Sequence, residues 1–250
     1  MRDLALVMAG GGGARMSASG VQLPKPLVPV GGVSLLERNV GQLLRHGFRA
    51  IVIAAPRNEP RIADFIDRSL RPVANAQGAQ VETLLESSPL GNFGAVRELA
   101  ERERDALVVF ADNLTDLDLR DLFDDHRDSG AALTAATHVQ RFRMPFGEVS
   151  LQDGAITRYR EKPSYDFMVC SAICAVSTRA MVAVGHGEAL GLGQLVDRLL
   201  SSGEVVRAYP HQAAWIDVND AVSLAEAERL VRDRPDDFGI TSSNAGSLEP

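Results

Sequence analysis

Residues 4–15 read LALVMAGGGGAR, an apolar run that passes directly into four glycines and an arginine. An uninterrupted apolar run of this length predicts a strand that is buried on both faces, as in parallel sheets. Successive glycines let the backbone approach a ligand closely and adopt positive φ angles. Because the loop after the first strand of an open α/β sheet lies where ligands bind, we expect its N–H groups to hold a phosphate.

The rest of the first half alternates apolar runs with amphipathic stretches. Ser34 and Glu37 have the spacing of a capping box, which predicts a helix that begins there and ends at Gly47. This alternation predicts an α/β fold, a Rossmann-like three-layer α/β/α arrangement with a mostly parallel central sheet. Its further elements are expected as strands at 50–55, 81–85 and 107–111 and helices at 62–70 and 93–101.

After about residue 115 the rhythm changes to short strands joined by turns. The dipeptide Asp153-Gly154 is a hairpin signal between two of them. We therefore expect a smaller, mixed antiparallel part followed by two helices. The expected strands are 131–137, 147–151, 155–160 and 169–176, and the expected helices are 192–201 and 221–232.

Composition narrows the class of ligand. The chain has 250 residues, is 45% hydrophobic and carries a formal net charge of −7 with no run of Lys and Arg, which argues against nucleic acid. A few cations and backbone N–H groups can still bind a small anion. Cys170 and Cys174 are expected to be reduced core thiols. No apolar run approaches a membrane span, and we expect a soluble, cytoplasmic protein.

Two basic residues stand out near the glycines. Arg15 ends the glycine run, and its planar guanidinium suits phosphate oxygens. Lys25 lies between two prolines in LPKPL (23–27), which stiffen the segment around it. The loop lacks the G-K-[ST] ending of a P-loop and the G-x-G-x-x-G spacing of a dinucleotide site.

The glycine run with its arginine, followed by P-K-P-L, resembles the nucleotidyltransferase family that makes nucleotide sugars. The resemblance continues in order through ESSPLGNFGA (86–95), FAD (110–112), FG (146–147), EKP (161–163) and WIDV (215–218). It implies that the triphosphate and base are bound by Ala9, Gly10, Gly11, Gly13, Glu86, Pro89 and Gly91. It implies catalytic roles for Arg15, Lys25 and Lys162, and Mg²⁺ bound by Asp112 and Asp217.

For the acceptor, the resemblance implies that Gly147 lies against the sugar, Glu161 bonds its hydroxyls and Lys162 holds its phosphate. Cys170 stands where the family usually has Asn, and Ala172 where it usually has Gly. The family pattern divides a single domain, 1–235, into a nucleotide-binding half (1–115) and an acceptor-binding half (116–235). The polar segment 236–250 is expected to be a mobile tail.

The resemblance implies an enzyme that joins a nucleoside triphosphate and a sugar 1-phosphate with release of pyrophosphate. The sugar phosphate would attack the α-phosphorus directly, in a Mg²⁺-dependent reaction. The E-x-x-P-L-G form favours guanylyl over uridylyl, thymidylyl or cytidylyl transfer, and a homodimer is the family default. Two alternatives stay open. One is a cytidylyltransferase of the same fold that acts on a non-sugar alcohol phosphate, and the other is an inactive module that senses nucleotide sugars.

Overall fold

The computed structural model describes residues 2–10 and 23–238, and a seven-stranded sheet forms its centre. The strand order is β12-β8-β11-β6-β1-β4-β5. The first strand, β1 (Leu4–Met8), is buried along its whole length and pairs in parallel with β4 (Ala50–Pro56) and β6 (Ala106–Phe110). β5 (Gln80–Glu86) continues the parallel part beyond β4. The predicted run of buried parallel strands is confirmed.

The other side of the sheet is mixed. β11 (Ser164–Val176) pairs antiparallel with both β6 and β8 (Leu133–Arg143). β12 (Val206–Pro210) lies parallel to β8 at the outer edge. The sheet is therefore mostly parallel where the chain begins and antiparallel where the second half joins it.

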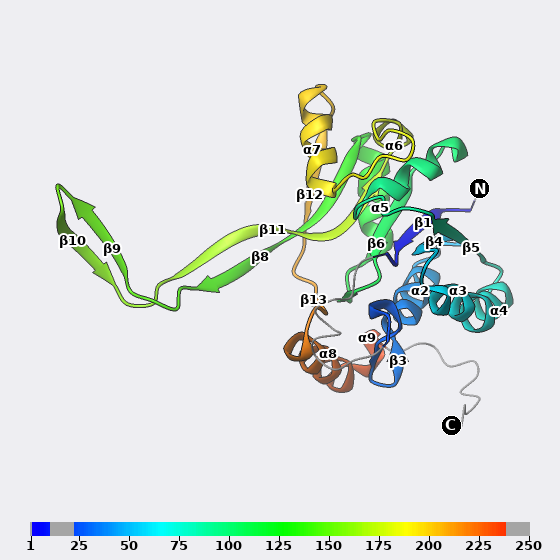
Figure 1. Cartoon of the computed structure of the whole chain (residues 1–250), viewed down its shortest axis with the longest axis horizontal. Coiled ribbons are helices and arrows are strands. Elements are labelled where there is room, and N and C mark those ends of the chain that lie inside the picture. The colour runs from blue at the N-terminus through cyan, green and yellow to red at the C-terminus, as the bar shows by residue number, and fades with distance from the viewer. Residues whose placement is uncertain (1, 11–22, 239–250) are drawn as a thin grey trace.

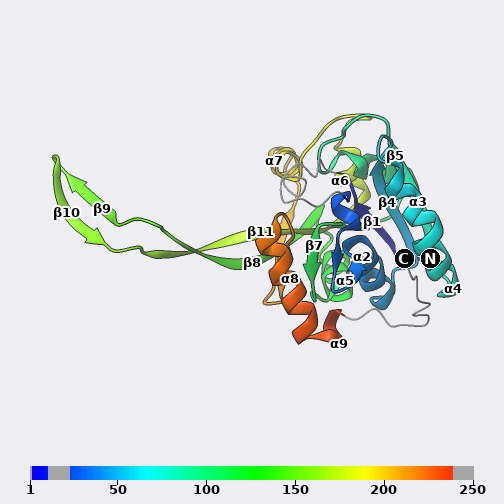
Figure 2. The same ribbon diagram turned by 60° about the horizontal axis from the view of Figure 1, so that its bottom comes forward.

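Helices cover both faces of the sheet and produce three layers (Figures 1 and 2). Side chains of β1 alternate between the two faces, with Ala5 and Val7 in one buried cluster and Leu4 and Leu6 in the other. The first cluster is completed by α2 (Leu35–Arg45), α3 (Pro60–Phe65), η2 (Ile66–Leu70), α4 (Arg71–Ala76) and α5 (Leu119–Ser129). The second is completed by η3 (Gly94–Arg102), α6 (Thr178–Val182) and α7 (Leu192–Ser201). The predicted α/β/α architecture is confirmed.

The helix predicted from Ser34 forms as α2. The Ser34 hydroxyl accepts a hydrogen bond from the Glu37 N–H at 3.2 Å, and Gly47 follows the helix with a φ of 85°. The segment expected to be helical at 62–70 lies inside a longer helical stretch, and 93–101 falls largely within the 3-10 helix η3. Helix α5 was not predicted.

A third, smaller cluster lies below the carboxyl ends of the central strands. Val28, Val30, Leu114 and Ile216 belong to it, together with Phe238. It joins β2 (Pro29–Val30), β7 (Asn113–Thr115), β13 (Trp215–Asp217), α8 (Ala221–Asp233) and α9 (Pro235–Phe238). The short elements η1 (Lys25–Leu27) and β3 (Val33–Ser34) flank β2 in the chain.

Helix α9 corrects one expectation about the tail. We expected residues 236–250 to be mobile, but Phe238 is only 3% exposed, and its carbonyl accepts a hydrogen bond from the Arg38 Nη1 at 2.7 Å. An apolar side chain that fits a small cluster fixes a terminal segment that composition alone marks as polar. Residues 239–250 lie outside the described residues.

The largest departure from a compact shape is a long β-arm (Figures 1 and 2). We define the arm as residues 139–168, which contain the outer halves of β8 and β11 and the hairpin β9 (Glu148–Gln152) and β10 (Ala155–Arg160). The predicted turn at its tip is confirmed, since Asp153 and Gly154 have φ angles of 48° and 82°. We expected this segment to belong to a compact acceptor-binding half, but it projects away from the body.

Candidate active site

Two aspartates that are 105 positions apart in the chain meet at the end of the central strands. Asp112 follows β6 directly, and its carbonyl accepts a hydrogen bond from the Val218 N–H at 2.9 Å. β13 pairs antiparallel with β7, which places Asp217 opposite Asn113. The sequence prediction that both aspartates lie at one site agrees with this geometry.

An irregularity in β11 holds the two aspartate-bearing strands in place. The register of β11 against β8 shifts between Cys170 and Cys174, where Ala172 has a φ of 54°. The carbonyl of Ser171 therefore points out of the ladder and accepts hydrogen bonds from the Asn113 Nδ2 at 3.1 Å and the Trp215 Nε1 at 2.8 Å. Asn113 neighbours Asp112 and Trp215 lies two residues before Asp217, so one carbonyl fixes both carboxylates relative to each other.

Lys25 lies between the two carboxylates. Its ammonium nitrogen Nζ is 2.6 Å from Asp112 Oδ2 and 3.6 Å from Asp217 Oδ1, and it also donates to the Asn219 side-chain carbonyl. Lys25 begins the short helix η1 after Pro24, and Pro26 beside it is buried. This agrees with the prediction that the prolines hold the lysine.

Asn219 was missed by sequence reasoning. Its amide nitrogen donates to Asp217, and its carbonyl oxygen accepts from Lys25. The signal for it was weak, because an asparagine after WIDV also suits the turn that leads into α8. Only the paired contacts to Lys25 and Asp217 reveal its place in the site.

The electrostatic balance at this site favours a cation. Burial raises the pKa of Asp217, and the nearby Asp112 carboxylate raises it further, against the opposing effect of Lys25. Asp217 Oδ1 is buried and, apart from the Lys25 ammonium at 3.6 Å, has no hydrogen-bonding partner among the described residues. Two carboxylates and an amide oxygen are the hard donors that Mg²⁺ prefers, with phosphate and water as its remaining ligands. In the described part of the chain, no three His, Cys, Asp or Glu side chains are grouped so that they could hold a metal ion by themselves.

The start of the glycine loop adjoins a second, half-buried carboxylate. The Ala9 N–H donates to the Ala54 carbonyl at 2.8 Å, which fixes the end of β1, and Gly10 follows it at the surface. A Cβ atom placed on Gly10 would lie 3.2 Å from Glu86 Oε2. Burial raises the pKa of Glu86, and its Oε1 is buried without a hydrogen-bond partner. Gly11, Gly13 and Arg15 lie outside the described residues.

Backbone conformation and packing explain why residue 91, in the P-L-G segment, is a glycine. Gly91 has a φ of 72°, and a Cβ there would lie 2.6 Å from the Leu190 carbonyl oxygen. Pro89 is exposed in the loop just before it, after Glu86 ends β5. The structure thus places Glu86 and Gly10 side by side and puts Pro89 and Gly91 on the loop that leads away from them.

The predicted acceptor residues are not brought to the aspartates. Gly147, Glu161 and Lys162 lie on the arm, beyond the part of it that joins the body (Figure 1). Gly147 lies against Tyr159, since a Cβ there would lie 2.2 Å from the Tyr159 hydroxyl oxygen, and that hydroxyl donates to Glu161 at 2.6 Å. Within one chain these residues therefore lie apart from Asp112 and Asp217, because the strands around them extend outward.

Cys170 lies where the arm joins the body. It is exposed, in contrast to the buried Cys174, so the expectation of two core thiols holds for Cys174 alone. Its position opposite Thr137 places it just before the irregularity that carries the Ser171 carbonyl.

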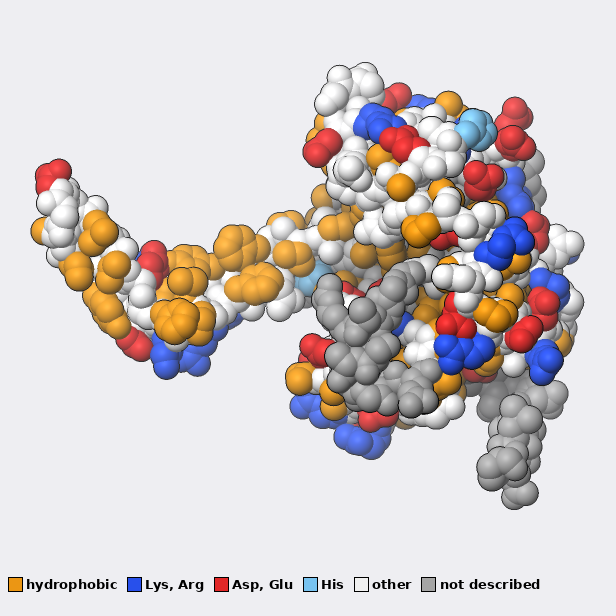
Figure 3. All heavy atoms as spheres, viewed as in Figure 1, with side chains coloured by type: hydrophobic (Ala, Val, Ile, Leu, Met, Phe, Trp, Pro, Cys, Tyr) orange, Lys and Arg blue, Asp and Glu red, His pale blue; other side chains and the backbone are white. Residues whose placement is uncertain are grey.

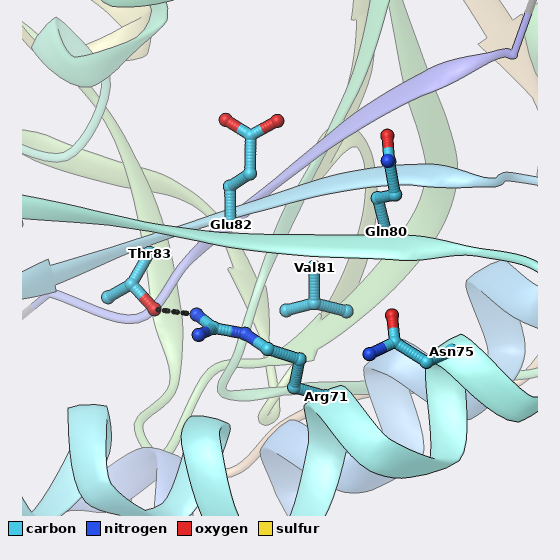
Figure 4. A pocket seen from close by; sticks show the side chains of 6 residues that line it. All are labelled: Arg71, Asn75, Gln80, Val81, Glu82 and Thr83. Carbon is cyan, nitrogen blue, oxygen red and sulfur yellow. Dashed lines mark hydrogen bonds between the residues drawn. The ribbon is translucent and has the colours of Figure 1, made fainter.

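A separate hollow lies between α4 and the first half of β5 (Figure 4). It is lined by Arg71, Asn75 and the strand residues 80–83, and Arg71 donates to the Thr83 hydroxyl at 3.4 Å. Glu86 ends the same strand on the side of the aspartates. The hollow is thus at the opposite end of β5 from the candidate active site.

A family model described as nucleotidyl transferase matches residues 4–234 of this sequence. The chain belongs to the nucleotidyl transferase family. The matched range of this nucleotidyl transferase includes β1, both aspartates and the arm.

Curated relatives of this nucleotidyl transferase are named for the transfer of different nucleotides. A valienol-1-phosphate guanylyltransferase from Streptomyces hygroscopicus subsp. limoneus is 29% identical over 92% of this chain and 72% of its own length. A UTP–glucose-1-phosphate uridylyltransferase from Synechocystis is 26% identical over 92% of this chain and 63% of its own length. The chain therefore spans about two thirds of the length of these two relatives.

Solved structures confirm the fold. The crystal structure of HddC from Yersinia pseudotuberculosis matches with a TM-score of 0.70 at 20% identity, covering 92% of this chain and 99% of that one. At this identity the likeness concerns the fold. Within the described residues, no helix of this nucleotidyl transferase has the length and apolar character needed to cross a membrane.

Proposed function

We propose that this nucleotidyl transferase joins a nucleoside triphosphate to a sugar 1-phosphate and releases pyrophosphate. The observation that carries the proposal is the Asp112–Lys25–Asp217 cluster at the carboxyl ends of β6 and β13, beside the start of the glycine loop. Ligands of open α/β sheets bind at this edge. The names of the relatives, which act on sugar phosphates or a related cyclitol phosphate, support the same class of acceptor.

The metal in this proposal is Mg²⁺, with Asp112 and Asp217 as its protein ligands. Bound there, Mg²⁺ would neutralise charge on the triphosphate and on the departing pyrophosphate. Asp217 Oδ1 supports this assignment, because it is buried, accepts no hydrogen bond from the described residues and lies 3.6 Å from the Lys25 ammonium, too far for a direct hydrogen bond. Lys25 would then be free to turn its ammonium toward a phosphate oxygen.

The chemistry requires no nucleophile from the protein. A non-bridging oxygen of the acceptor phosphate forms a bond to the α-phosphorus, and the bond from the α-phosphorus to the bridging oxygen breaks. The electron pair leaves on pyrophosphate, so atoms and charge balance without a covalent enzyme intermediate. Positioning two polyanions and neutralising their charge then account for the rate. Arg15 and Lys25 would act on the triphosphate and Lys162 on the acceptor phosphate, with Glu161 bonding acceptor hydroxyls.

GTP is the nucleotide that Glu86 favours. A carboxylate accepts two hydrogen bonds side by side, and the N1–H and N2–H edge of guanine donates two in that geometry, whereas uracil and thymine donate one. The unpartnered Glu86 Oε1 supports this role. The cytosine amino group is the competing donor, and it belongs to the alternative of a cytidylyltransferase acting on a non-sugar alcohol phosphate.

A panel assay tests the proposal. GTP, UTP, dTTP and CTP are each combined with mannose, glucose and heptose 1-phosphates and with glycerol and erythritol phosphates, and pyrophosphate release is followed with and without Mg²⁺. We expect Mg²⁺-dependent release that is highest with GTP and a sugar 1-phosphate. Highest release with CTP and an alcohol phosphate would favour the alternative enzyme. No release with any pair would favour the sensing module.

A further inference from the structure

Helix α2 buries three polar side chains beside its leucines. These are Arg38, Asn39 and Gln42. A helix that only fills a core needs no such groups, because a buried polar group is costly unless it is hydrogen-bonded, and asparagine is also a poor helix former. Each of the three donates to backbone carbonyls outside the helix. The helix therefore holds other segments by hydrogen bonds as well as by packing.

Asn39 reaches the segment that carries Asp112. Its Nδ2 donates to the Asn113 carbonyl at 3.1 Å and, with a longer contact, to the Ala111 carbonyl at 3.4 Å. The same nitrogen donates to the Leu35 carbonyl of its own helix at 2.9 Å. Ala111 and Asn113 are the two neighbours of Asp112 in the chain. One buried amide thus bonds the backbone on both sides of this aspartate.

The segment around Asp112 is a short link between two sheets. β6 ends at Phe110 in the central sheet, and β7 begins at Asn113. Among the described residues, β7 pairs with β13 alone, in a sheet of two strands. Buried backbone carbonyls need donors, and this link has fewer strand partners to provide them than the central strands have. Asn39 supplies a donor from the helix.

The same helix also holds the segment that carries Lys25. The Val28 N–H donates to the Lys25 carbonyl at 3.1 Å and closes η1, and the Val28 carbonyl accepts a hydrogen bond from the Leu35 N–H at 3.0 Å. Helix α2 is therefore bonded to both segments that meet at the 2.6 Å contact between Lys25 Nζ and Asp112 Oδ2.

We propose that Asn39 is a positioning residue that sets the place of Asp112 relative to Lys25, and so the geometry of the metal site. The inference rests on the proposed function, from which it takes the metal-binding role of Asp112. Asn39 bonds the backbone beside Asp112 rather than its carboxylate. Groups that orient metal ligands affect metal affinity and turnover strongly, because a small displacement of a ligand misplaces the reacting groups.

Gln42 provides a matched control on the same helix. It is 5% exposed, as is Asn39, and it donates to the Leu117 carbonyl at 3.0 Å, beyond β7. Gln42→Leu therefore removes an equally buried amide without touching the neighbours of Asp112. Asn39→Leu removes the amide under study, and Asn39→Ser keeps a hydroxyl that can bond only the helix carbonyl one turn back. All three variants should have a lower Tm than the wild type.

Amide hydrogen exchange in the metal-free protein tests the positioning without reference to activity. The Val218 N–H is bonded to the Asp112 carbonyl, and the Ala9 N–H, bonded to Ala54, serves as a reference in the core. The ratio of the Val218 to the Ala9 exchange rate should rise at least roughly fivefold in both Asn39 variants and stay unchanged in Gln42→Leu. An unchanged ratio in the Asn39 variants, or an equal rise in Gln42→Leu, would overturn the proposal.

Kinetics test the consequence for the reaction, with the substrate pair that reacts fastest in the panel assay. In both Asn39 variants kcat should fall about tenfold, and the Mg²⁺ concentration for half-maximal rate should rise about tenfold. Gln42→Leu should keep both values at a temperature well below its Tm. Wild-type values in the Asn39 variants, or equal losses in Gln42→Leu, would overturn the proposal. An inactive wild type would instead overturn the proposed function, and the exchange ratio would then decide alone whether Asn39 holds Asp112.

Discussion

Asp217 is the residue at which stability and function oppose each other most clearly. Its carboxylate is half-buried beside Asp112, and one of its oxygens has no hydrogen-bond partner. Like-charged carboxylates held together out of water destabilise a fold, and Lys25 offsets this effect on Asp217 only in part, since the pKa of Asp217 stays raised. Proteins retain such arrangements where activity requires them.

The first prediction concerns Asp217→Asn. Loss of a metal-binding carboxylate should lower turnover by at least about a hundredfold, with the circular dichroism spectrum unchanged. The same variant should have a higher Tm than the wild type at pH 7 without divalent ions. Asp124→Asn, which changes an exposed carboxylate on α5, serves as the matched control and should alter neither quantity.

The pH dependence of that Tm difference follows from the pKa. Because the pKa of Asp217 is raised above 3.8, the folded chain binds its proton more tightly than the unfolded chain. The folded state therefore loses stability as the pH rises from about 3.8 through the raised pKa. The Tm advantage of Asp217→Asn should be larger at pH 7 than at pH 4. An equal or reversed advantage would contradict the account of its burial.

Glu86→Gln provides the second prediction. The amide can accept only one of the two hydrogen bonds that guanine offers, and its NH₂ group faces a donor. The KM for GTP should rise roughly 5- to 100-fold, the range that a lost bidentate base contact gives. The Tm should rise, since burial of this carboxylate is unfavourable. Steady-state kinetics with GTP and UTP test whether Glu86 contacts guanine. An equal rise of the KM for both nucleotides would contradict that contact.

At the residue scale, the sequence pointed to site residues mainly through the family resemblance. Its segments FAD (110–112) and WIDV (215–218) indicated Asp112 and Asp217, and the two prolines beside Lys25 added a local signal. Asn219 was not found, because its role depends on contacts with residues far along the chain. The separation of Glu161 and Lys162 from the aspartates was also not foreseen, because spacing in sequence does not state the direction in which a strand extends.

At the element scale, the Ser171 carbonyl joins β7 and β13. The third prediction is that Trp215→Phe, which keeps an aromatic side chain of smaller size but removes the Nε1–H donor, lowers turnover about tenfold through displacement of Asp217. Stability should fall by only about 1 kcal/mol, because Asn113 still satisfies the carbonyl. The double variant Trp215→Phe, Asp217→Asn should have the same turnover as Asp217→Asn alone. Additive losses would show that Trp215 acts independently of the metal ligands.

Elements with clear periodicity were predicted and those without it were not. β1, β4, β6 and α7 follow the predicted ranges because their apolar residues are continuous or recur at helical spacing. Helix α5 was missed, although Asp118 caps it, because charged residues fill most of its surface. The end of α9 was missed since a single phenylalanine anchors it.

At the scale of the whole molecule, the arm is the feature that no local pattern predicted. The sequence showed its strands and its Asp153-Gly154 turn, but alternation of side chains does not reveal whether a strand packs on its own body or projects from it. One chain therefore combines a buried core with a ribbon on which large apolar side chains are exposed (Figure 3).

The measurement that tests the central claim most directly is the fate of radiolabelled GTP. The enzyme is incubated with Mg²⁺, a sugar 1-phosphate and GTP labelled either at the α- or the γ-phosphorus. We predict that the α label moves into a nucleotide sugar and the γ label into pyrophosphate in equal amounts, and that Asp112→Asn stops both. Release of the γ label as inorganic phosphate, or retention of both labels in GTP with every acceptor tested, would contradict the account.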